Sequence, residues 1–266
     1  MDLLDNFSVG TQATIVALVF GGLTVAGLLA VRWFVQWEHL RENHDVAGFT
    51  FGVIGAFYGV VLAFVIVAVW ERFERAQAAS QQEALALANL YNLANGFHDP
   101  MRIKMQDAVR EYTKVVVNNE WEAMSQDRYG GDSKSADVIW AALIHYKPTD
   151  SAEQTFIDKS IDQMAQLNDA RRLRYVYYSQ DLPSVIWIVI YAGCLITIGF
   201  TYFFGIRRIR DQALMCGAFA ALIGLTILAI SELATPYSGA IHVSSQAFQA
   251  VFTGMATPAP SAEASP

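Results

Sequence analysis

The side chains best suited to chemistry in this sequence are its histidines, and they lack the spacing of a catalytic or metal site. They are scattered along the chain, at His39, His44, His98, His145 and His242. His39 and His44 are five residues apart, which is wider than the His-to-His spacing of the zinc-binding HExxH pattern. The GxSxG, P-loop and GxGxxG motifs are absent. The sequence therefore predicts no enzyme, no metal site and no cofactor.

Glutamates form the second set of candidate functional groups. Glu71, Glu74 and Glu83 lie near helical spacing, so they could line the vestibule of a channel. A charged row on a helix is more often a solvated face, and that interpretation is favoured here.

The elements that must position these groups are four stretches without Lys, Arg, Asp or Glu. They cover residues 6–31, 46–70, 182–206 and 212–231. As a helix rising about 1.5 Å per residue, each can cross a hydrocarbon core of roughly 30 Å. The chain is 54% hydrophobic and only 16% charged. We predict an all-α, polytopic membrane protein with four transmembrane helices in two hairpins, embedded in the lipid bilayer.

A polar helical bundle is predicted between transmembrane helices 2 and 3. The expected domains are 1–70 (helices 1 and 2), 71–181 (the water-soluble bundle), 182–234 (helices 3 and 4) and 235–266 (a C-terminal segment with a disordered tail). One continuous helix is expected over 47–95, because 71–95 contains no Gly or Pro and is rich in strong helix formers.

Capping patterns predict the other helices of the bundle. Asp99 as N-cap with Pro100 after it predicts a helix that continues to about residue 124. A short helix is expected over 135–146. Asp150 and Glu153 form a capping-box pattern that opens another long helix, and 245–252 can form at most a short amphipathic helix.

The charge distribution bears on partners and on sidedness. A net charge of −7 argues against nucleic acid as a partner, since phosphate binding needs clustered basic residues. The short turns carry Arg32, Arg41, Arg207, Arg208 and Arg210, so the positive-inside rule places the bundle outside the cytoplasm of a bacterial cell, with the chain in the inner membrane.

Few polar or reactive groups fall within the apolar stretches. Arg32 and Glu232 lie at stretch ends, where we expect them to reach toward the interface. Cys194 and Cys216 are interpreted as small packing residues within the bilayer.

Small residues at helical spacing indicate close helix packing in two of the apolar stretches. The candidates are Gly52, Gly55, Gly59 and Ala63 in the second stretch and Gly217 and Ala221 in the fourth. Such spacing occurs both inside one helical bundle and between subunits. Packing inside one bundle is favoured, and packing between subunits remains the alternative.

The second apolar stretch also carries a family resemblance. The run from Gly55 to Glu71 resembles the signature of the bestrophin-like domain family of bacterial membrane proteins, and further similarity extends over about residues 48–248, including Leu182-Pro183 and Pro236-Tyr237-Ser238-Gly239. Bestrophins are pentameric anion channels whose second membrane helix lines the pore. The resemblance thus implies a homo-oligomeric channel, with chloride or other anions as the candidate ions.

The pore-lining candidates that follow are Ile54, Phe57, Tyr58, Val61, Phe64 and Glu71. Bestrophins place the corresponding bundle in the cytoplasm, opposite to the placement that the positive-inside rule gives, and the two expectations stand side by side. The alternative function is a non-enzymatic, membrane-anchored sensor or scaffold whose helical bundle binds a partner.

Overall fold

The structure, a computed structural model, describes residues 7–34, 44–126, 128–129, 134–204, 206 and 208–256. Within these residues every regular element is helical, so the predicted all-α class is confirmed. The predictions for His39, Arg41 and Arg207 and for the disordered tail lie outside the described residues.

The chain divides into two compact units. The first, the membrane unit, comprises residues 1–72, 181–235 and 239–241, and the second, the helical block, comprises 73–180, 236–238 and 242–266. Helix α3 (His44–Leu93) contributes to both units as one uninterrupted helix of 50 residues. The prediction of a continuous helix over 47–95 is therefore correct to within a few residues at each end.

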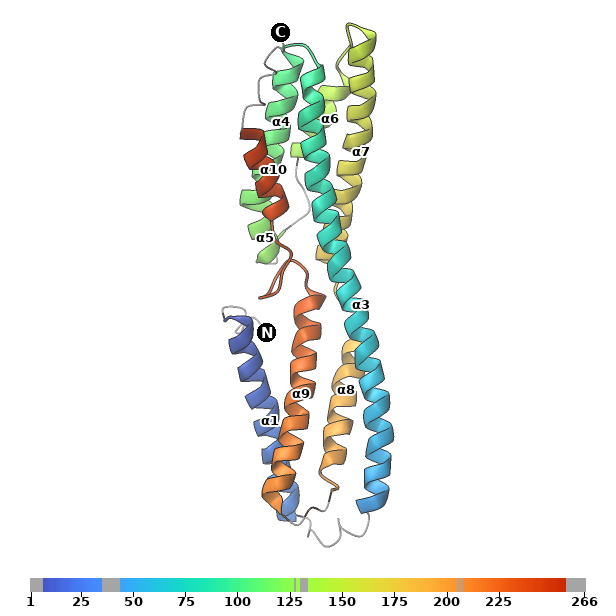
Figure 1. The fold of residues 1–266 in the computed structure, drawn as a ribbon, viewed down its shortest axis with the longest axis vertical. Helices are drawn as coiled ribbons and strands as arrows, with labels where there is room; N and C mark the ends of the chain where they lie inside the picture. Colours follow the sequence, from blue (N-terminus) through green and yellow to red (C-terminus); the bar gives the residue numbers. More distant parts are fainter. Residues whose placement is uncertain are drawn as a thin grey trace, which may run out of the picture. The chain divides into compact units, whose positions relative to one another are not determined.

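Among the described residues, the membrane unit contains four helices that are long and apolar enough to span a bilayer, as the sequence predicted. They are α1 (Val9–Phe34), the first half of α3, α8 (Ser184–Thr201) and α9 (Ile209–Ala234). Helices α1 and α8 run in one direction and α3 and α9 in the other (Figure 1). Cys194 on α8 and Cys216 on α9 are free and buried, as expected for packing residues.

Glycines allow α1 and α9 to approach closely. A Cβ atom added to Gly21 would lie 3.3 Å from the backbone oxygen of Gly217, and one added to Gly217 would lie 3.3 Å from Cγ2 of Val25. At Gly224 an added Cβ would meet the ring of Phe20 at 2.6 Å. In lipid, such close contact supplies much of the association between helices, because the surrounding chains are as apolar as the side chains.

The two charged residues at the ends of the apolar stretches have hydrogen-bond partners within the membrane unit. The expectation that they reach toward the interface stays a prediction. Arg32 donates to the backbone oxygen of Ile206 and to Gln212. Glu232 is buried and accepts the amide N–H groups of Ala240 and Ile241 at 2.9 and 3.1 Å. The intervening Gly239 has a φ of +81°, which suits glycine, and an added Cβ there would lie 2.9 Å from Glu232.

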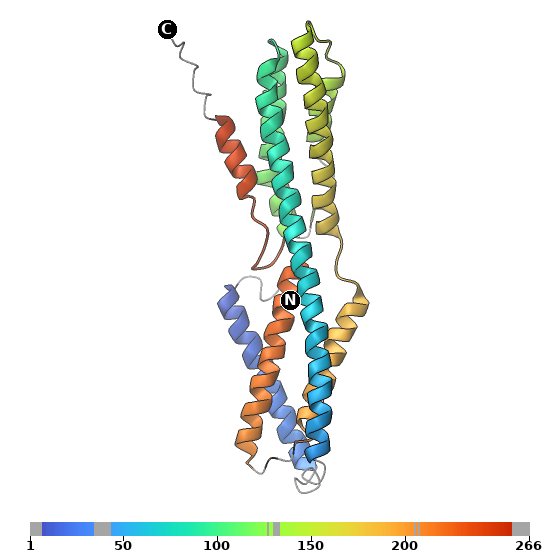
Figure 2. The same cartoon turned by 45° about the vertical axis from the view of Figure 1, so that its right-hand side comes forward.

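The helical block is built from long, roughly parallel or antiparallel helices, which Figures 1 and 2 show from two sides. After the second half of α3 come η1 (Ala94–Gly96), α4 (Met101–Val115), η2 (Val116–Glu120), α5 (Trp121–Ser125), α6 (Ser135–Ile144) and α7 (Ser151–Ser179). Apolar stripes of these helices form one core, with Leu87, Leu90, Met105, Val109 and Leu167 fully buried.

The predicted helix boundaries in the block hold in some places and fail in others. Asp150 does cap α7, since its Oδ1 accepts the N–H of Glu153 at 2.8 Å. Asp99 does not cap α4: the N-cap position is Pro100, with no side-chain bond, and Asp99 pairs with Arg102 instead. The expected α-helix to residue 124 is interrupted by η2, a π-helical turn. Helix α6 ends at Ile144, before the expected residue 146.

The last helix packs against the helical block. Helix α10 (Gln246–Ala256) covers all but the first residue of the expected 245–252 segment and extends about one turn beyond it. The carbonyl of Met255, its penultimate residue, accepts bonds from the hydroxyl of Tyr91 and from Arg110, at 3.0 and 3.1 Å. Phe248 is fully buried, 5.4 Å from the ring of Trp121. Helix α10 is therefore an integral part of this unit.

Candidate functional site

The pore-lining candidates on α3 differ in what surrounds them. Phe57 and Phe64 are 72% and 73% exposed in the single chain, while Ile54 and Val61 are partly buried. These four residues recur at helical spacing, and all are apolar. Such a surface can line a narrow passage that opens and closes by admitting or excluding water.

Tyr58 and Glu71 have different surroundings. Tyr58 is 6% exposed, and its hydroxyl donates to the backbone oxygen of Ile190 on α8 at 2.8 Å. Its ring also fills the space above Gly193, where an added Cβ would lie 2.3 Å away. Tyr58 therefore holds α3 against α8. Glu71 is exposed at the end of the apolar part of α3.

The two small-residue faces have different neighbours within the chain. A Cβ atom added at Gly52, Gly55 or Gly59 would meet no atom within 4 Å, and Ala63 is exposed. Gly217 instead packs against α1, and Ala221 on the same helix is partly buried. The α9 face is thus used within the chain, whereas the α3 face is uncovered.

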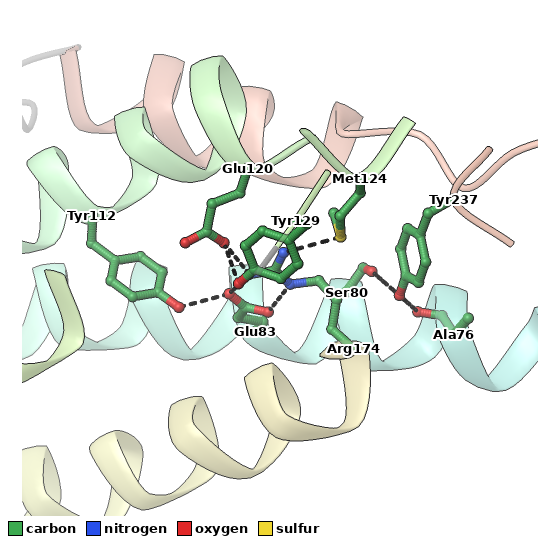
Figure 3. Close-up of polar contacts among 9 residues, drawn as sticks. All are labelled: Ala76, Ser80, Glu83, Tyr112, Glu120, Met124, Tyr129, Arg174 and Tyr237. Atoms are coloured by element: carbon green, nitrogen blue, oxygen red, sulfur yellow. Dashed lines mark hydrogen bonds and ion pairs between the residues drawn. The ribbon is translucent and has the colours of Figure 1, made fainter. Parts of the chain in front are cut away.

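The helical block contains a buried cluster of charges that the sequence reasoning missed. The Arg174 side chain is fully buried and binds Glu83 with two nitrogens, Nε to Oε2 at 2.6 Å and one terminal nitrogen to Oε1 at 3.0 Å. The same terminal nitrogen donates to Oε2 of Glu120 at 2.6 Å. Figure 3 shows the three side chains converging from α7, α3 and the end of η2. We call Glu83, Glu120 and Arg174 the buried ion cluster.

Neutral side chains complete the surroundings of the buried ion cluster. The hydroxyl of Tyr112 donates to Glu83 at 2.7 Å and that of Tyr129 to Glu120 at 3.1 Å. The guanidinium of Arg174 lies 5.8 Å from the ring centre of Trp121 and 5.6 Å from that of Tyr129, within the range of cation–π attraction. Most of the polar atoms in this buried cluster therefore have hydrogen-bond partners.

The surroundings of Arg174 and Tyr112 shift the pKa values of both side chains. Burial alone lowers the pKa of Arg174, but the charge of Glu83 and its hydrogen bonds, together with Glu120, raise that pKa well above its usual value. Burial, and then the charge of Glu83, raises the pKa of Tyr112 far above its usual value. The guanidinium thus stays charged and the phenol stays neutral at any physiological pH.

One atom of the buried ion cluster is unsatisfied. Among the described residues, none offers a hydrogen bond to Oε1 of Glu120, although this atom is buried. Glu120 is the last residue of the π-helical turn, and such turns are rare and occur frequently at functional sites. The cluster contains two carboxyl groups and one guanidinium group, and this oxygen is its one acceptor without a hydrogen bond among the described residues.

Signals for this cluster exist in the sequence. Glu83 lies between the core residues Ser80 and Leu87, and Arg174 continues the stripe of Met164 and Leu167 along α7. A charged residue at a core position of an amphipathic stripe indicates an internal ion pair. The interpretation of Glu83 as a vestibule or solvated side chain is wrong for this reason, while Glu74 is exposed as expected.

A further buried carboxyl group in the block, Glu153, joins the start of α7 to the connection between η1 and α4. It is 1% exposed and accepts hydrogen bonds from the backbone of His98 at 2.9 Å, from the His98 ring at 2.7 Å and from Tyr146 at 2.7 Å. Thr149 donates to it from both its backbone and its hydroxyl. The backbone donors of His98 and Thr149 lower the pKa of Glu153 far below its usual value.

The contact between His98 and Glu153 predicts a pH-dependent stability. The hydrogen bond and then the charge of Glu153 raise the pKa of His98 above its usual 6.5. A raised pKa in the folded state means that the stabilisation is complete below the unfolded pKa and is lost as the pH rises through the folded one. We expect the melting temperature of the His98→Gln variant to approach that of the wild type as the pH rises from below to above neutral.

The measurement is a pair of thermal melts at each pH on the full chain in detergent, followed by circular dichroism. His145→Gln is the matched control, because among the described residues the His145 ring bonds only the carbonyl of Ala141 in the adjoining helix α6. A wild-type advantage over the His98 variant that stays constant across this range would contradict the assignment.

No cluster of three or more His, Cys, Asp or Glu side chains suited to a metal ion occurs among the residues that the structure describes. The prediction of no metal site concerns the whole chain and stays a prediction. The apolar lining of α3 and the buried ion cluster are therefore the features with the clearest functional potential.

Comparison with known proteins identifies the family. The chain resembles solved structures of a bacterial bestrophin homologue from Klebsiella pneumoniae. For two of its variants the TM-scores are 0.64 and 0.63 at 13% identity, covering 92% of this chain and 98% and 100% of the other. For the form solved by zinc phasing the TM-score is 0.61 at 13% identity, covering 91% and 97%. No curated protein matches.

Identities this low show a shared fold and nothing more specific. The family itself is shown by a match to the model of the bestrophin-like domain, which extends over residues 18–248 and thus over most of the sequence. The chain belongs to the bestrophin-like domain family.

Proposed function

We propose that this chain assembles into an oligomeric membrane channel whose pore is lined by α3 and that conducts chloride or other anions. The observation that carries the proposal is the uncovered side of α3. In the described part of the chain, a Cβ added at Gly52, Gly55 or Gly59 would meet no atom within 4 Å, while Phe57 and Phe64 are exposed on the same helix. A helix with glycines on one side and large apolar side chains on another suits packing between subunits around a common axis.

The apolar side chains suggest how ions would be controlled. In a ring of subunits, Ile54, Phe57, Val61 and Phe64 would form successive hydrophobic constrictions, which close a pore by excluding water. Tyr58 is left out of this lining because its ring is buried against α8. Glu71 would lie at the end of the apolar tract.

The test is chloride efflux from liposomes containing the purified full chain. We expect flux above that of empty vesicles, and a rise of at least about threefold for Phe64→Ala, because a smaller ring of side chains admits water more readily. Phe34→Ala is the matched control, since Phe34 is equally exposed but lies on α1. Wild-type vesicles that pass no more chloride than empty ones would rule out the proposal.

The same proposal covers the placement of the protein in the cell. The chain is a membrane protein, and we propose the bacterial inner membrane as its location. The positive-inside rule favours an extracytoplasmic helical block, and bestrophin-like topology favours a cytoplasmic one.

A sensor or scaffold is the second candidate function. One observation favours it: the helical block contains a concave pocket between α6 and α7 whose volume, about 670 Å³, suits a ligand. Flux through wild-type vesicles would favour the channel, and the two functions are compatible if occupancy of the block modulates the flux.

A further inference from the structure

The pocket between α6 and α7 lies entirely within the helical block. Its volume of about 670 Å³ falls in the range of small-molecule sites. The buried side chains of Ala136 and Met164 contribute an apolar floor. Trp140 on α6 and Tyr175 on α7 line it as partly exposed aromatic side chains. The pocket therefore combines an apolar base with two flat aromatic surfaces.

The polar groups around the pocket are mainly hydrogen-bond donors. Arg171, Arg172 and Asn168 line it from α7, and Asp137 supplies the single carboxylate. Among the described residues, the side chains of Arg172, Asn168 and Trp140 make no hydrogen bond or ion pair with the protein. Donors that the protein leaves unused, together with an excess of positive charge, select for a ligand with a negative, hydrogen-bond-accepting group.

The inner guanidinium is held in place from behind. Arg171 hydrogen-bonds to Tyr129, and the hydroxyl of Tyr129 donates to Glu120 of the buried ion cluster at 3.1 Å. The ring of Tyr129 also packs edge-on against Tyr175 at 6.1 Å. A binding group that is already fixed loses less conformational freedom when a ligand arrives.

We propose that this pocket binds a small organic anion with an aromatic or other planar ring, its acidic group held by Arg171 and Arg172 and its ring against Trp140 and Tyr175. Carboxylates and phosphate esters share the required chemistry, because both present oxygen pairs to a guanidinium fork. An acidic side chain of a partner protein would satisfy the arginines, but the concave shape and volume favour a small molecule. The inference does not depend on ion conduction.

The test uses phenyl phosphate and benzoate as probes, titrated by calorimetry into the full chain in detergent micelles. We expect saturable binding at one site per chain for at least one of the acids, and none for the neutral benzyl alcohol. Arg172→Gln should weaken binding about tenfold, which is the loss of one charge-assisted hydrogen bond. Trp140→Ala should weaken it severalfold through the lost ring contact.

Lys159→Gln is the matched control, because it removes the same charge from the same helix at an exposed position that does not line the pocket. Its affinity should equal that of the wild type. Equal weakening by Lys159→Gln and Arg172→Gln would overturn the proposal, as would saturable binding of the alcohol. Failure of both acids to bind would also overturn it and would leave a protein side chain as the occupant. Circular dichroism of each variant verifies its fold.

Discussion

Arg174→Met is expected to destabilise the helical block by about 3–5 kcal/mol, which is the usual cost of removing one partner from a buried ion pair. The side chain of Arg174 is fully buried, and methionine occupies a similar length without any donor. Glu83 and Glu120 would then face each other inside the core with only tyrosine hydroxyls as partners. Both carboxylates would have to take up protons or draw in water.

Urea or thermal unfolding of the full chain in detergent, followed by circular dichroism, measures the effect. Arg172→Met is the matched control, because the neighbouring Arg172 is exposed, and its stability should change by less than about 0.5 kcal/mol. The stability of Arg174→Lys should lie between those of the two methionine variants, because an ammonium keeps the charge but cannot form the two-nitrogen contact with Glu83. Equal stabilities for Arg174→Met and Arg172→Met would disprove the importance of the cluster.

Gly21→Leu is expected to separate α1 from α9 and so to disrupt the membrane unit. An added Cβ at Gly21 already lies 3.3 Å from a backbone oxygen, and backbone cannot move aside as a flexible side chain can. The three further carbons of leucine have no space in this contact. Overpacking alone typically costs about 1–3 kcal/mol, and the loss of the close contact between two helices adds to it.

Gly22→Leu is the matched control for this substitution. Gly22 is the next residue on the same helix, and a Cβ there would meet nothing within 4 Å. The fraction of each variant that remains monodisperse in detergent after heating, measured by size-exclusion chromatography, should fall sharply for Gly21→Leu and hardly at all for Gly22→Leu. Similar behaviour of the two would show that the α1–α9 contact is not tight.

The sequence predicts the membrane-spanning helices well because the physical constraint on them is severe. Within hydrocarbon, every backbone group must be bonded inside its own segment, so apolar length almost determines the structure. The continuity of α3 was predictable for a similar reason, because nothing between Glu71 and Leu93 could end a helix. The N-cap at Asp150 was predictable as well, because Asp150 and its partner Glu153 lie within one helical turn.

The features that escaped prediction depend on partners distant in sequence. Asp99 is the local exception: it had the residue type of an N-cap, but its side chain pairs with Arg102, three residues further on. Glu83 and Arg174 are 91 residues apart, and no periodicity within either helix indicates that they meet. Arg32 similarly finds its acceptors at Ile206, in the connection between the last two membrane helices, and at Gln212, in the first turn of α9. Which of these side chains bond to one another is determined only when the helices pack together.

The π-helical turn Val116–Glu120 accommodates one residue more than an α-helical turn would. A single-residue deletion within this turn would restore regular α geometry and leave the later side chains close to their present directions. The same deletion in the regular helix α4 would instead rotate every later side chain by about 100° around the axis. Trp121 and Met124 would then point away from Arg174, which they now contact. The number of residues between Met101 and Trp121 is therefore under the same steric constraint as the side chains that surround the arginine.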